Sequence, residues 1–390
     1  MTRPRRVAVA LTLLAGLVVP AGGALAGAGP GDGPGGGPAP GSFTEHSYPA
    51  PGAPGAREYW LYVPAGPPRR HLPVVVFLHG CNETAPQAAV ATRFDALADQ
   101  RGFLVVYPQE NVTAPSTAPL ADGNGIGCWN WFLPQDQVRG SGEAATIAGI
   151  TEQVVSDEQA DPDRVYVEGI SAGADMSVIL AASYPDVFAA VGVWAGCAYA
   201  TCADASGELA YAAMGPRKRI VPLFVENGTA DTANPFPLAV GLVASWLGVD
   251  DLADDGAMNG SVSRTPSSVT SYDLNQTPVP GSGDPCVHND TWTCPGGVIG
   301  FQGSYPYTVS DYTSASGCEL IEFVAIHGME HAIPDGPAGQ PYTDPLGPDM
   351  TAASYDFFLR HPLSGEADGG GPAGNPRGTG ACGGPPGSAR

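Results

Sequence analysis

The hydrophobic pattern alternates between two kinds of segment along most of the chain. Short continuous apolar runs, rich in branched and aromatic residues, are typical of strands buried on both faces of a sheet. Such runs occur at Pro73–Leu78, Phe103–Tyr107, Arg164–Glu168, Val187–Trp194, Ile220–Val225 and Glu319–Ile326. Arg57–Val63 instead alternates polar and apolar residues, which predicts an outer strand.

Between these runs the spacing of apolar residues fits helices that bury one side. The predicted helices cover Pro86–Gln100, Glu143–Gln159, Ala174–Tyr184, Pro237–Leu247 and Met350–Arg360. Strands that alternate with helices favour an α/β fold, in which a mostly parallel sheet has helices on both faces.

The pattern also divides the chain into segments. Residues 55–363 form the predicted folded domain, and residues 248–313, polar and rich in Gly and Pro, are an irregular insertion or cap within it. Residues 27–54 are a Gly/Pro-rich flexible leader, and residues 364–390 are a similar tail.

The first 26 residues have the three parts of a secretory signal peptide. Arg3, Arg5 and Arg6 precede an apolar stretch from Val7 to Val19, and Ala24-Leu25-Ala26 provides a small-x-small cleavage site. A membrane anchor is the alternative, but the apolar stretch is shorter than the ~20 residues needed to span a bilayer. We therefore expect an extracellular protein without a membrane anchor, and the export pathway, Sec or twin-arginine, stays open.

The formal net charge of −22 makes nucleic acid an improbable partner, because the protein would repel a phosphate backbone. Eight cysteines in an exported chain favour disulfides over a metal site, since no C-x-x-C occurs and the histidines do not cluster with the cysteines. We expect no metal and no cofactor. The cysteines stand at positions Cys81, Cys128, Cys197, Cys202, Cys286, Cys294, Cys318 and Cys382.

Gly169-Ile170-Ser171-Ala172-Gly173 lies between a predicted strand and a predicted helix. A G-x-S-x-G sequence in that setting is a nucleophile elbow, a tight turn that exposes the serine hydroxyl. A glycine-rich structural turn is the alternative interpretation. The context favours Ser171 as a catalytic nucleophile.

A serine nucleophile requires a base and a carboxylate that orients the base. Asp231 follows the strand Ile220–Val225 and is our candidate carboxylate, with Glu226 and the cluster Asp250, Asp251, Asp254 and Asp255 as rivals. We expect that cluster to form a solvated face. His331 in the loop after Glu319–Ile326 is the candidate base, and His327 is the less favoured alternative.

The negative charge that develops on an attacked carbonyl oxygen needs backbone N–H donors. Ala172, directly after the nucleophile, supplies one, and the loop after Pro73–Leu78 supplies the other from Cys81 or Gly80. We expect His79 to be a structural anchor of this loop.

Several motifs occur together in one order: H-G-C after a buried strand, C-W-N-W-F, the elbow, N-G-T-A-D and H-G-M-E-H-A-I-P-D-G. This set resembles the secreted polyhydroxybutyrate-depolymerase-type esterases, which include feruloyl and acetylxylan esterases. The resemblance implies an α/β-hydrolase fold, no metal, and a triad of Ser171, Asp231 and His331. The sequence departs from the family pattern at Glu330 and Ile333, and the shape of the acyl pocket therefore stays open.

The resemblance further suggests that Cys81 pairs with Cys128, and that Cys286 or Cys294 pairs with Cys318. Cys197 and Cys202 are close enough in sequence to form a local bridge. Trp129 and Trp131 are candidates for the wall of the substrate pocket. Trp292, Tyr305 and Tyr307 in the insertion either line a polymer groove or are scattered surface aromatics.

We therefore expect a monomeric serine esterase that acts on a short-chain hydroxyalkanoate polyester, or alternatively on feruloyl or acetyl esters of polysaccharide. A serine peptidase, a triglyceride lipase and a catalytically inactive binding protein on the same fold are the competing hypotheses.

Overall fold

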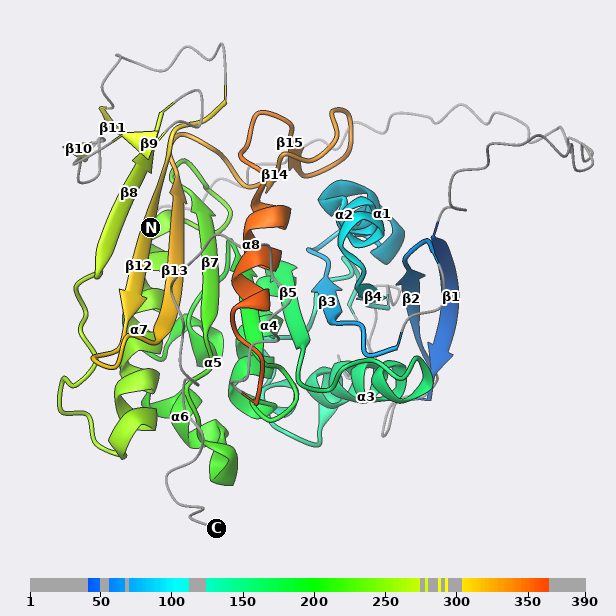
Figure 1. The fold of residues 1–390 in the computed structure, drawn as a ribbon, viewed down its shortest axis with the longest axis horizontal. Coiled ribbons are helices and arrows are strands. Elements are labelled where there is room, and N and C mark those ends of the chain that lie inside the picture. The colour runs from blue at the N-terminus through cyan, green and yellow to red at the C-terminus, as the bar shows by residue number, and fades with distance from the viewer. Residues whose placement is uncertain are drawn as a thin grey trace, which may run out of the picture. The chain divides into compact units, whose positions relative to one another are not determined.

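The computed structural model describes residues 41–49, 56–66, 70–111, 124–273 and 304–364, together with three two-residue strands at 278–279, 287–288 and 292–293. Within these residues eleven strands form one sheet in the order β1-β2-β4-β3-β5-β6-β7-β13-β12-β8-β9 (Figure 1). The central strands β4 (Leu104–Pro108), β3 (Val74–Leu78), β5 (Val165–Ile170), β6 (Ala190–Trp194), β7 (Leu223–Gly228) and β13 (Glu319–Ile326) are mutually parallel.

Antiparallel strands extend this centre on both sides. On one side β2 (Arg57–Val63) pairs with β4, and β1 (Ser42–Tyr48) pairs with β2. On the other side β12 (Tyr307–Thr313), β8 (Ser268–Tyr272) and β9 (Pro278–Val279) continue from β13. Two-stranded sheets join β10 (Val287–His288) to β11 (Trp292–Thr293) and β14 (Ile333–Pro334) to β15 (Thr343–Asp344).

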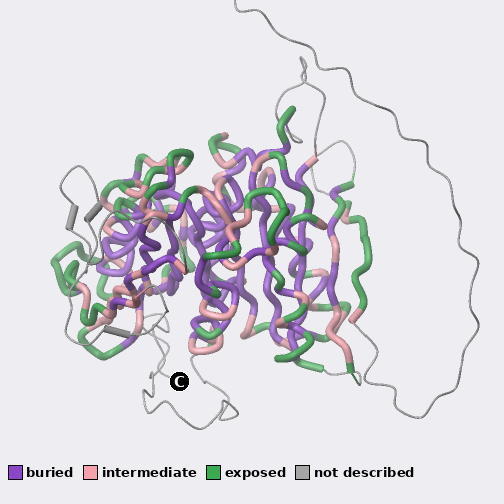
Figure 2. The backbone as a smooth tube through the Cα atoms, turned by 90° about the horizontal axis from the view of Figure 1, so that it is seen from above, coloured by how far each residue is buried: buried purple, intermediate pink, exposed green. Residues whose placement is uncertain are grey.

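Helices cover both faces of the sheet, as predicted. One core cluster joins the sheet to α3 (Gly142–Asp157), α4 (Ala172–Ser183), α6 (Glu208–Ala213) and α7 (Phe236–Asp255). The other joins it to α1 (Ala85–Thr92), α2 (Phe94–Arg101) and α8 (Met350–Leu359). The short helices are α5 (Tyr199–Cys202), η1 (Pro134–Asp136) and η2 (Gly215–Arg217). Figure 2 shows the buried backbone concentrated in the centre of the structure.

The predicted helix Pro86–Gln100 is two helices. Arg93 takes a left-handed conformation with φ of 58°, which ends α1 and starts α2 in a new direction. Thr84 caps α1 with a reciprocal bond to Gln87, so the helix begins where its free N–H groups find an acceptor. Apolar spacing alone does not reveal this break, because both helices bury alanines against the same core.

The leader prediction was wrong for its last part. Residues 42–48 form β1, which pairs along its whole length with β2. The side chains of β1 are mostly exposed, so the strand is fixed by backbone hydrogen bonds and lacks the apolar pattern of a buried strand. Residues 1–40, which include the predicted signal peptide, and the tail 365–390 lie outside the described residues.

We expected the acidic cluster to form a solvated face, and this is correct only for Asp254 and Asp255, which are exposed at the end of α7. The expectation is wrong for the other two residues, because α7 continues to Asp255 and packs its earlier turns on the core. Asp250 and Asp251 are 0% and 4% exposed. Asp251 accepts hydrogen bonds from the N–H groups of Gly260 and Val262 and from the Ser261 hydroxyl, and so fixes the chain after the helix. α7 is long and apolar enough to cross a membrane, but 56% of its most apolar window is buried inside the protein, as in a core helix.

Candidate active site

Ser171 lies on the turn between β5 and α4 and has the strained geometry of a nucleophile elbow. Its φ of 57° and ψ of −123° are sparsely populated for a residue with a side chain. A Cβ on Gly169 would lie 2.5 Å from the carbonyl carbon of Gly173, and one on Gly173 would lie 2.1 Å from the carbonyl oxygen of Leu78. Both glycines are therefore required by the close approach of β3, β5 and α4.

Asp231 and His331 are paired although 100 residues separate them in the chain. The Nδ1 atom of His331 lies 2.7 Å from Oδ2 of Asp231, whose side chain is fully buried. The other carboxylate oxygen, Oδ1, accepts the backbone N–H groups of Ala233 and Asn234 at 2.8 Å each. The carboxylate is thus held in place, and Nδ1–H of His331 donates to it, which directs Nε2 away from Asp231.

Hydrogen bonds between two loops bring this pair together. Thr229 N–H donates to the Ile326 carbonyl, Ala230 N–H donates to the Met329 carbonyl, and Gly328 N–H donates to the Thr229 hydroxyl. A Cβ on Gly228 would lie 2.3 Å from the Met329 carbonyl oxygen, so only glycine allows the loops to approach this closely. The loops follow the parallel neighbours β7 and β13, whose carboxyl ends share one edge of the sheet.

The loop after β3 lies against the elbow. A Cβ on Gly80 would be 3.6 Å from the carbonyl oxygen of Ile170, the residue before Ser171. The sequence left the N–H of Gly80 and the N–H of Cys81 open as the second oxyanion donor. Gly80 N–H donates to Oε2 of Glu83 at 2.8 Å and is therefore not available for that role. The N–H of Cys81 is the remaining candidate of that pair.

Glu83 was not foreseen as part of this site. It is buried, and desolvation raises the pKa of its carboxyl to about 7, whereas the Gly80 N–H and the positive form of His331 act in the opposite direction. Its electrostatic interaction with His331 places the β3 loop and the base in one neighbourhood. An acidic residue inside a buried loop is a weak sequence signal, because it is equally typical of an exposed turn.

His79 anchors the β3 loop, as expected. Burial lowers the pKa of its ring to about 4, so it is neutral at pH 7. Nδ1–H donates to the Gly80 carbonyl at 2.8 Å, and Nε2 accepts the N–H of Glu110 at 3.0 Å. Trp129 is fully buried and donates from Nε1 to the His79 carbonyl, so it supports the loop and does not form a pocket wall. Trp131 is partly buried and packs on the core.

Two disulfides match the expected pairs. Cys81–Cys128 joins the β3 loop to the tryptophan loop, and Cys197–Cys202 closes a short loop after β6. Cys318 is disulfide-bonded as well. Cys286 and Cys294, its expected partners, and Cys382 lie outside the described residues.

The alternative site residues lie elsewhere. His327 is buried at the end of β13 and bonds through Nε2 to the Thr308 hydroxyl at 2.8 Å. Glu226 is buried within β7, and burial raises its pKa well above its ordinary value, whereas the ring of His331 is bonded to Asp231. Glu330 is exposed and Ile333 is buried in the core.

Comparisons with known proteins find similarity to esterases in sequence and in fold. Residues 57–237 match the family model described as esterase PHB depolymerase. The poly(3-hydroxyalkanoate) depolymerase C of Paucimonas lemoignei is 34% identical over 289 residues, which cover 73% of this chain and 60% of that protein. Feruloyl esterase B of Neurospora crassa is 34% identical over 134 residues, which cover 34% of this chain and 42% of that protein.

The chain therefore spans less than two thirds of the length of these curated relatives. Among solved structures, an acetyl xylan esterase from Aspergillus awamori aligns with a TM-score of 0.53 and 20% sequence identity, and the alignment covers 81% of this chain and 98% of that one. Together with the parallel centre of the sheet, this match shows the predicted α/β-hydrolase fold.

Proposed function

Because residues 57–237 match the esterase PHB depolymerase family model, we propose that the chain is a member of that family and that it hydrolyses carboxylic esters through an acyl-enzyme. The observation on which the proposal rests is the Asp231–His331 pair at 2.7 Å, at the sheet edge where the strained Ser171 also lies. A histidine oriented by a buried carboxylate is the arrangement that activates a serine hydroxyl.

In the proposed reaction Nε2 of His331 takes the hydroxyl proton of Ser171 as its oxygen attacks the ester carbonyl. Asp231 holds the ring and stabilises the imidazolium that forms. The N–H groups of Ala172 and Cys81 bind the negatively charged oxygen, and one such donor contributes ~2.7–4 kcal/mol. His331 then protonates the leaving alcohol and activates the water that releases the acid.

A short-chain hydroxyalkanoate polyester or its oligomers are the proposed substrate, supported by the depolymerase with the longest match reported above. Feruloyl or acetyl esters of polysaccharide are the second candidate, supported by the cavity described in the next subsection. The two disulfides suit the proposed extracellular location, and we propose that the enzyme acts there as a monomer.

The decisive variant is Ser171→Ala. It should abolish hydrolysis of p-nitrophenyl butyrate and labelling by a fluorophosphonate probe, while the melting temperature stays close to that of the unmodified protein. Turnover in this variant would disprove the assignment of the nucleophile. Clearing of a polyhydroxybutyrate emulsion, compared with release of acetate or ferulate from polysaccharide, distinguishes the two substrate classes.

A further inference from the structure

A cavity of about 670 Å³ lies on the antiparallel side of the sheet, lined by β8, β12 and β13 on one side and α8 on the other. Its volume is within the ~300–1,000 Å³ that is usual for small-molecule sites. The lining is unusual for such sites because it is mainly polar, with serine, threonine and tyrosine hydroxyls beside three carboxylates and one guanidinium. None of these residues belongs to the proposed triad.

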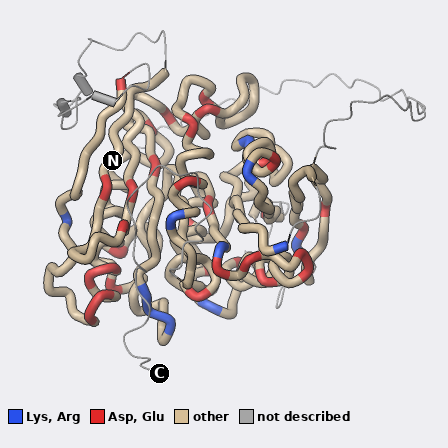
Figure 3. The backbone as a smooth tube through the Cα atoms, in the orientation of Figure 1, with Lys and Arg blue, Asp and Glu red and all other residues tan. Residues whose placement is uncertain are grey.

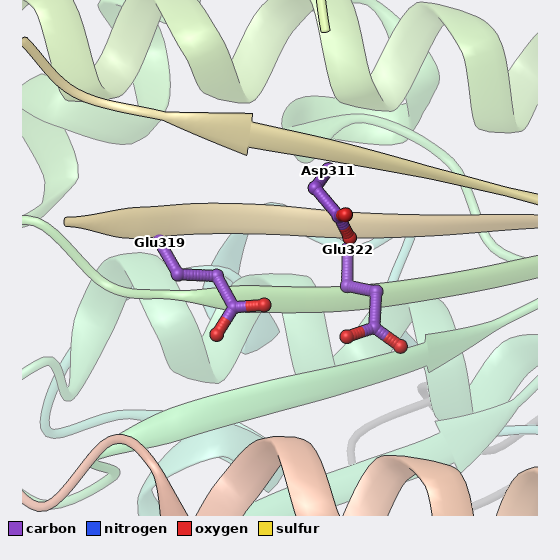
Figure 4. A group of neighbouring side chains, drawn as sticks. All are labelled: Asp311, Glu319 and Glu322. Atoms are coloured by element: carbon purple, nitrogen blue, oxygen red, sulfur yellow. The ribbon is translucent and has the colours of Figure 1, made fainter. Parts of the chain in front are cut away.

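A β-bulge in β13 places two of the carboxylates on the cavity side. Tyr312 pairs with Ile321 and Thr313 pairs with Glu319, so Leu320 is an extra residue in β13. Leu320 is buried in the core cluster on the face of the sheet away from the cavity, and Glu319 therefore faces the same side as Glu322. Figure 4 shows Glu319 and Glu322 extending to the same side, with Asp311 on the neighbouring strand.

The charges in the cavity argue against an ion as its ligand. Arg360 donates to both oxygens of Glu319 at 2.9 and 3.0 Å and to Glu322 at 2.7 Å. Three of the four oxygens of these two carboxylates thus already accept from the guanidinium, and a metal ion would have to displace it to use them. An anion would in turn face three carboxylates and one paired arginine. Figure 3 shows that acidic residues are also spread over other elements of the structure.

An aromatic pair forms the other notable part of the lining. Tyr272 of β8 and Tyr307 of β12 stand opposite each other in register, and their rings stack with centroids 4.3 Å apart and planes 6° apart. Both residues are partly exposed. A polyester chain would gain little here, because carboxylates and hydroxyls surround the rings.

We propose that this cavity binds a neutral saccharide. A sugar has an apolar face that can pack against a tyrosine ring and hydroxyl groups that can both donate to carboxylates and accept from a guanidinium. Glu319 and Glu322 are each 16% exposed and Arg360 is 33% exposed, so their unused lone pairs and N–H groups are accessible. A neutral polyhydroxylated ligand is the class that matches the whole lining.

The position of the cavity gives this site a role in substrate choice. Tyr307 pairs with Ile326 at the carboxyl end of β13, the strand that leads to His331, whereas Glu319 lies at the other end of the same strand. A saccharide chain bound along β13 would therefore run toward the proposed catalytic edge. This part of the inference depends on the proposed function and favours its polysaccharide-ester substrate, whereas the binding itself does not depend on it.

The test is calorimetric titration of the full-length protein with xylohexaose and with cellohexaose, neither of which contains an ester. We expect binding of at least one oligosaccharide. Tyr272→Ala and Glu322→Gln should each weaken that binding by about tenfold, through loss of the ring contact and of the charged acceptor. Tyr272→Phe keeps the ring and should stay close to the unmodified protein.

Tyr211→Ala on α6, outside the cavity, is the matched control and should leave the affinity unchanged. The proposal is overturned if neither oligosaccharide binds at millimolar concentration, if the control weakens binding as much as Tyr272→Ala, or if Ca²⁺ binds in place of the sugars. Hydrolysis of p-nitrophenyl butyrate by the same variants should be normal. A protein that binds the sugars but has no activity on that ester would refute the proposed function and leave the saccharide site intact.

Discussion

Asp231 uses both carboxylate oxygens, and each use requires an acceptor. Oδ1 accepts two backbone N–H groups, and Oδ2 accepts Nδ1–H of His331. In Asp231→Asn the single amide oxygen can accept either from the two backbone N–H groups or from His331. The NH₂ group then faces the remaining donor and cannot accept from it. With the oxygen kept by the backbone, His331 is forced into the wrong tautomer. We expect kcat for p-nitrophenyl butyrate to fall about 10⁴-fold, as in a triad whose aspartate is replaced by asparagine.

Asp204→Asn is the control for that measurement. Asp204 is also a buried aspartate, and its two oxygens accept the N–H groups of Gly207 and Ala210 at the start of α6. Its replacement should lower the melting temperature and leave kcat unchanged. Equal losses of kcat in the two variants would show that Asp231 acts only through stability.

Glu83 should make stability depend on pH in a defined direction. Its carboxyl ionises at an ordinary pKa of 4.5 in the unfolded chain and at about 7 in the folded protein. Between these values the folded state holds a proton that the unfolded state has released. The contribution of Glu83 to the free energy of unfolding is therefore fully present below pH 4.5 and is lost as the pH rises through 7. The loss approaches about 3 kcal/mol at higher pH.

Glu83→Gln keeps an oxygen for the Gly80 N–H and removes the titration. Its free energy of unfolding should therefore exceed that of the unmodified protein at pH 8, whereas the two should be equal at pH 4. Urea denaturation at both pH values measures the difference. A variant that is less stable at pH 8 would show that the ionised carboxylate stabilises the β3 loop.

At the scale of elements, the elbow exists because α4 lies directly on β3 and β5. A Cβ on Gly173 would meet the backbone carbonyl oxygen of Leu78. Leu78 belongs to the central strand β3, so its backbone cannot shift without disturbing the sheet. We expect Gly173→Ala to cost at least the ~1–3 kcal/mol typical of overpacking and to abolish activity by displacing Ser171. Gly241→Ala in α7 is the contrast, because no atom lies within 4 Å of its added Cβ. It should stabilise the protein by about 0.5–1 kcal/mol in thermal or urea unfolding.

The elements of the parallel centre were predictable because each is a continuous apolar run. The same reasoning predicted that Asp231 and His331 meet at one edge of the sheet, and the structure pairs them. The catalytic roles of this pair and of Ser171 stay predictions. It failed where backbone geometry decides the outcome. The left-handed Arg93 divides one apolar helix pattern into two helices, and β1 is fixed by pairing without an apolar pattern. The burial of Asp250 and Asp251 depends on contacts that no local pattern encodes.

At the scale of the whole molecule, the parallel centre of the sheet and its antiparallel side at β12 and β8 differ in what covers their faces. The parallel centre has helices on both faces, whereas β12 and β8 leave a polar surface beside α8. A Gly/Pro-rich sequence predicted only an irregular insertion for this region, because polar strands with one open face lack the apolar runs of the centre. The bulge at Leu320 is likewise invisible in the sequence, although it creates the carboxylate pair.

The Cys81–Cys128 and Cys197–Cys202 disulfides should differ in how much each stabilises the whole fold. Cys81–Cys128 closes a loop with a sequence separation of 47, and Cys197–Cys202 closes one with a separation of 5. In the chain-entropy description these loops contribute about 4 and about 2 kcal/mol, because a longer loop loses more freedom in the unfolded state. Replacing each pair by alanines should therefore lower the free energy of unfolding more for the first pair than for the second.

Catalysis should separate the two pairs more sharply than stability does. Cys81 provides the proposed oxyanion N–H, and its bridge to Cys128 joins that loop to the buried Trp129, whose indole N–H holds the His79 carbonyl. Loss of this bridge should lower kcat for p-nitrophenyl butyrate well below that of the Cys197→Ala/Cys202→Ala protein, both measured far below their melting temperatures. If the two double variants have the same kcat, the β3 loop is rigid without its disulfide, and the hydrogen bonds of His79, Glu83 and Trp129 alone hold the oxyanion donor in place.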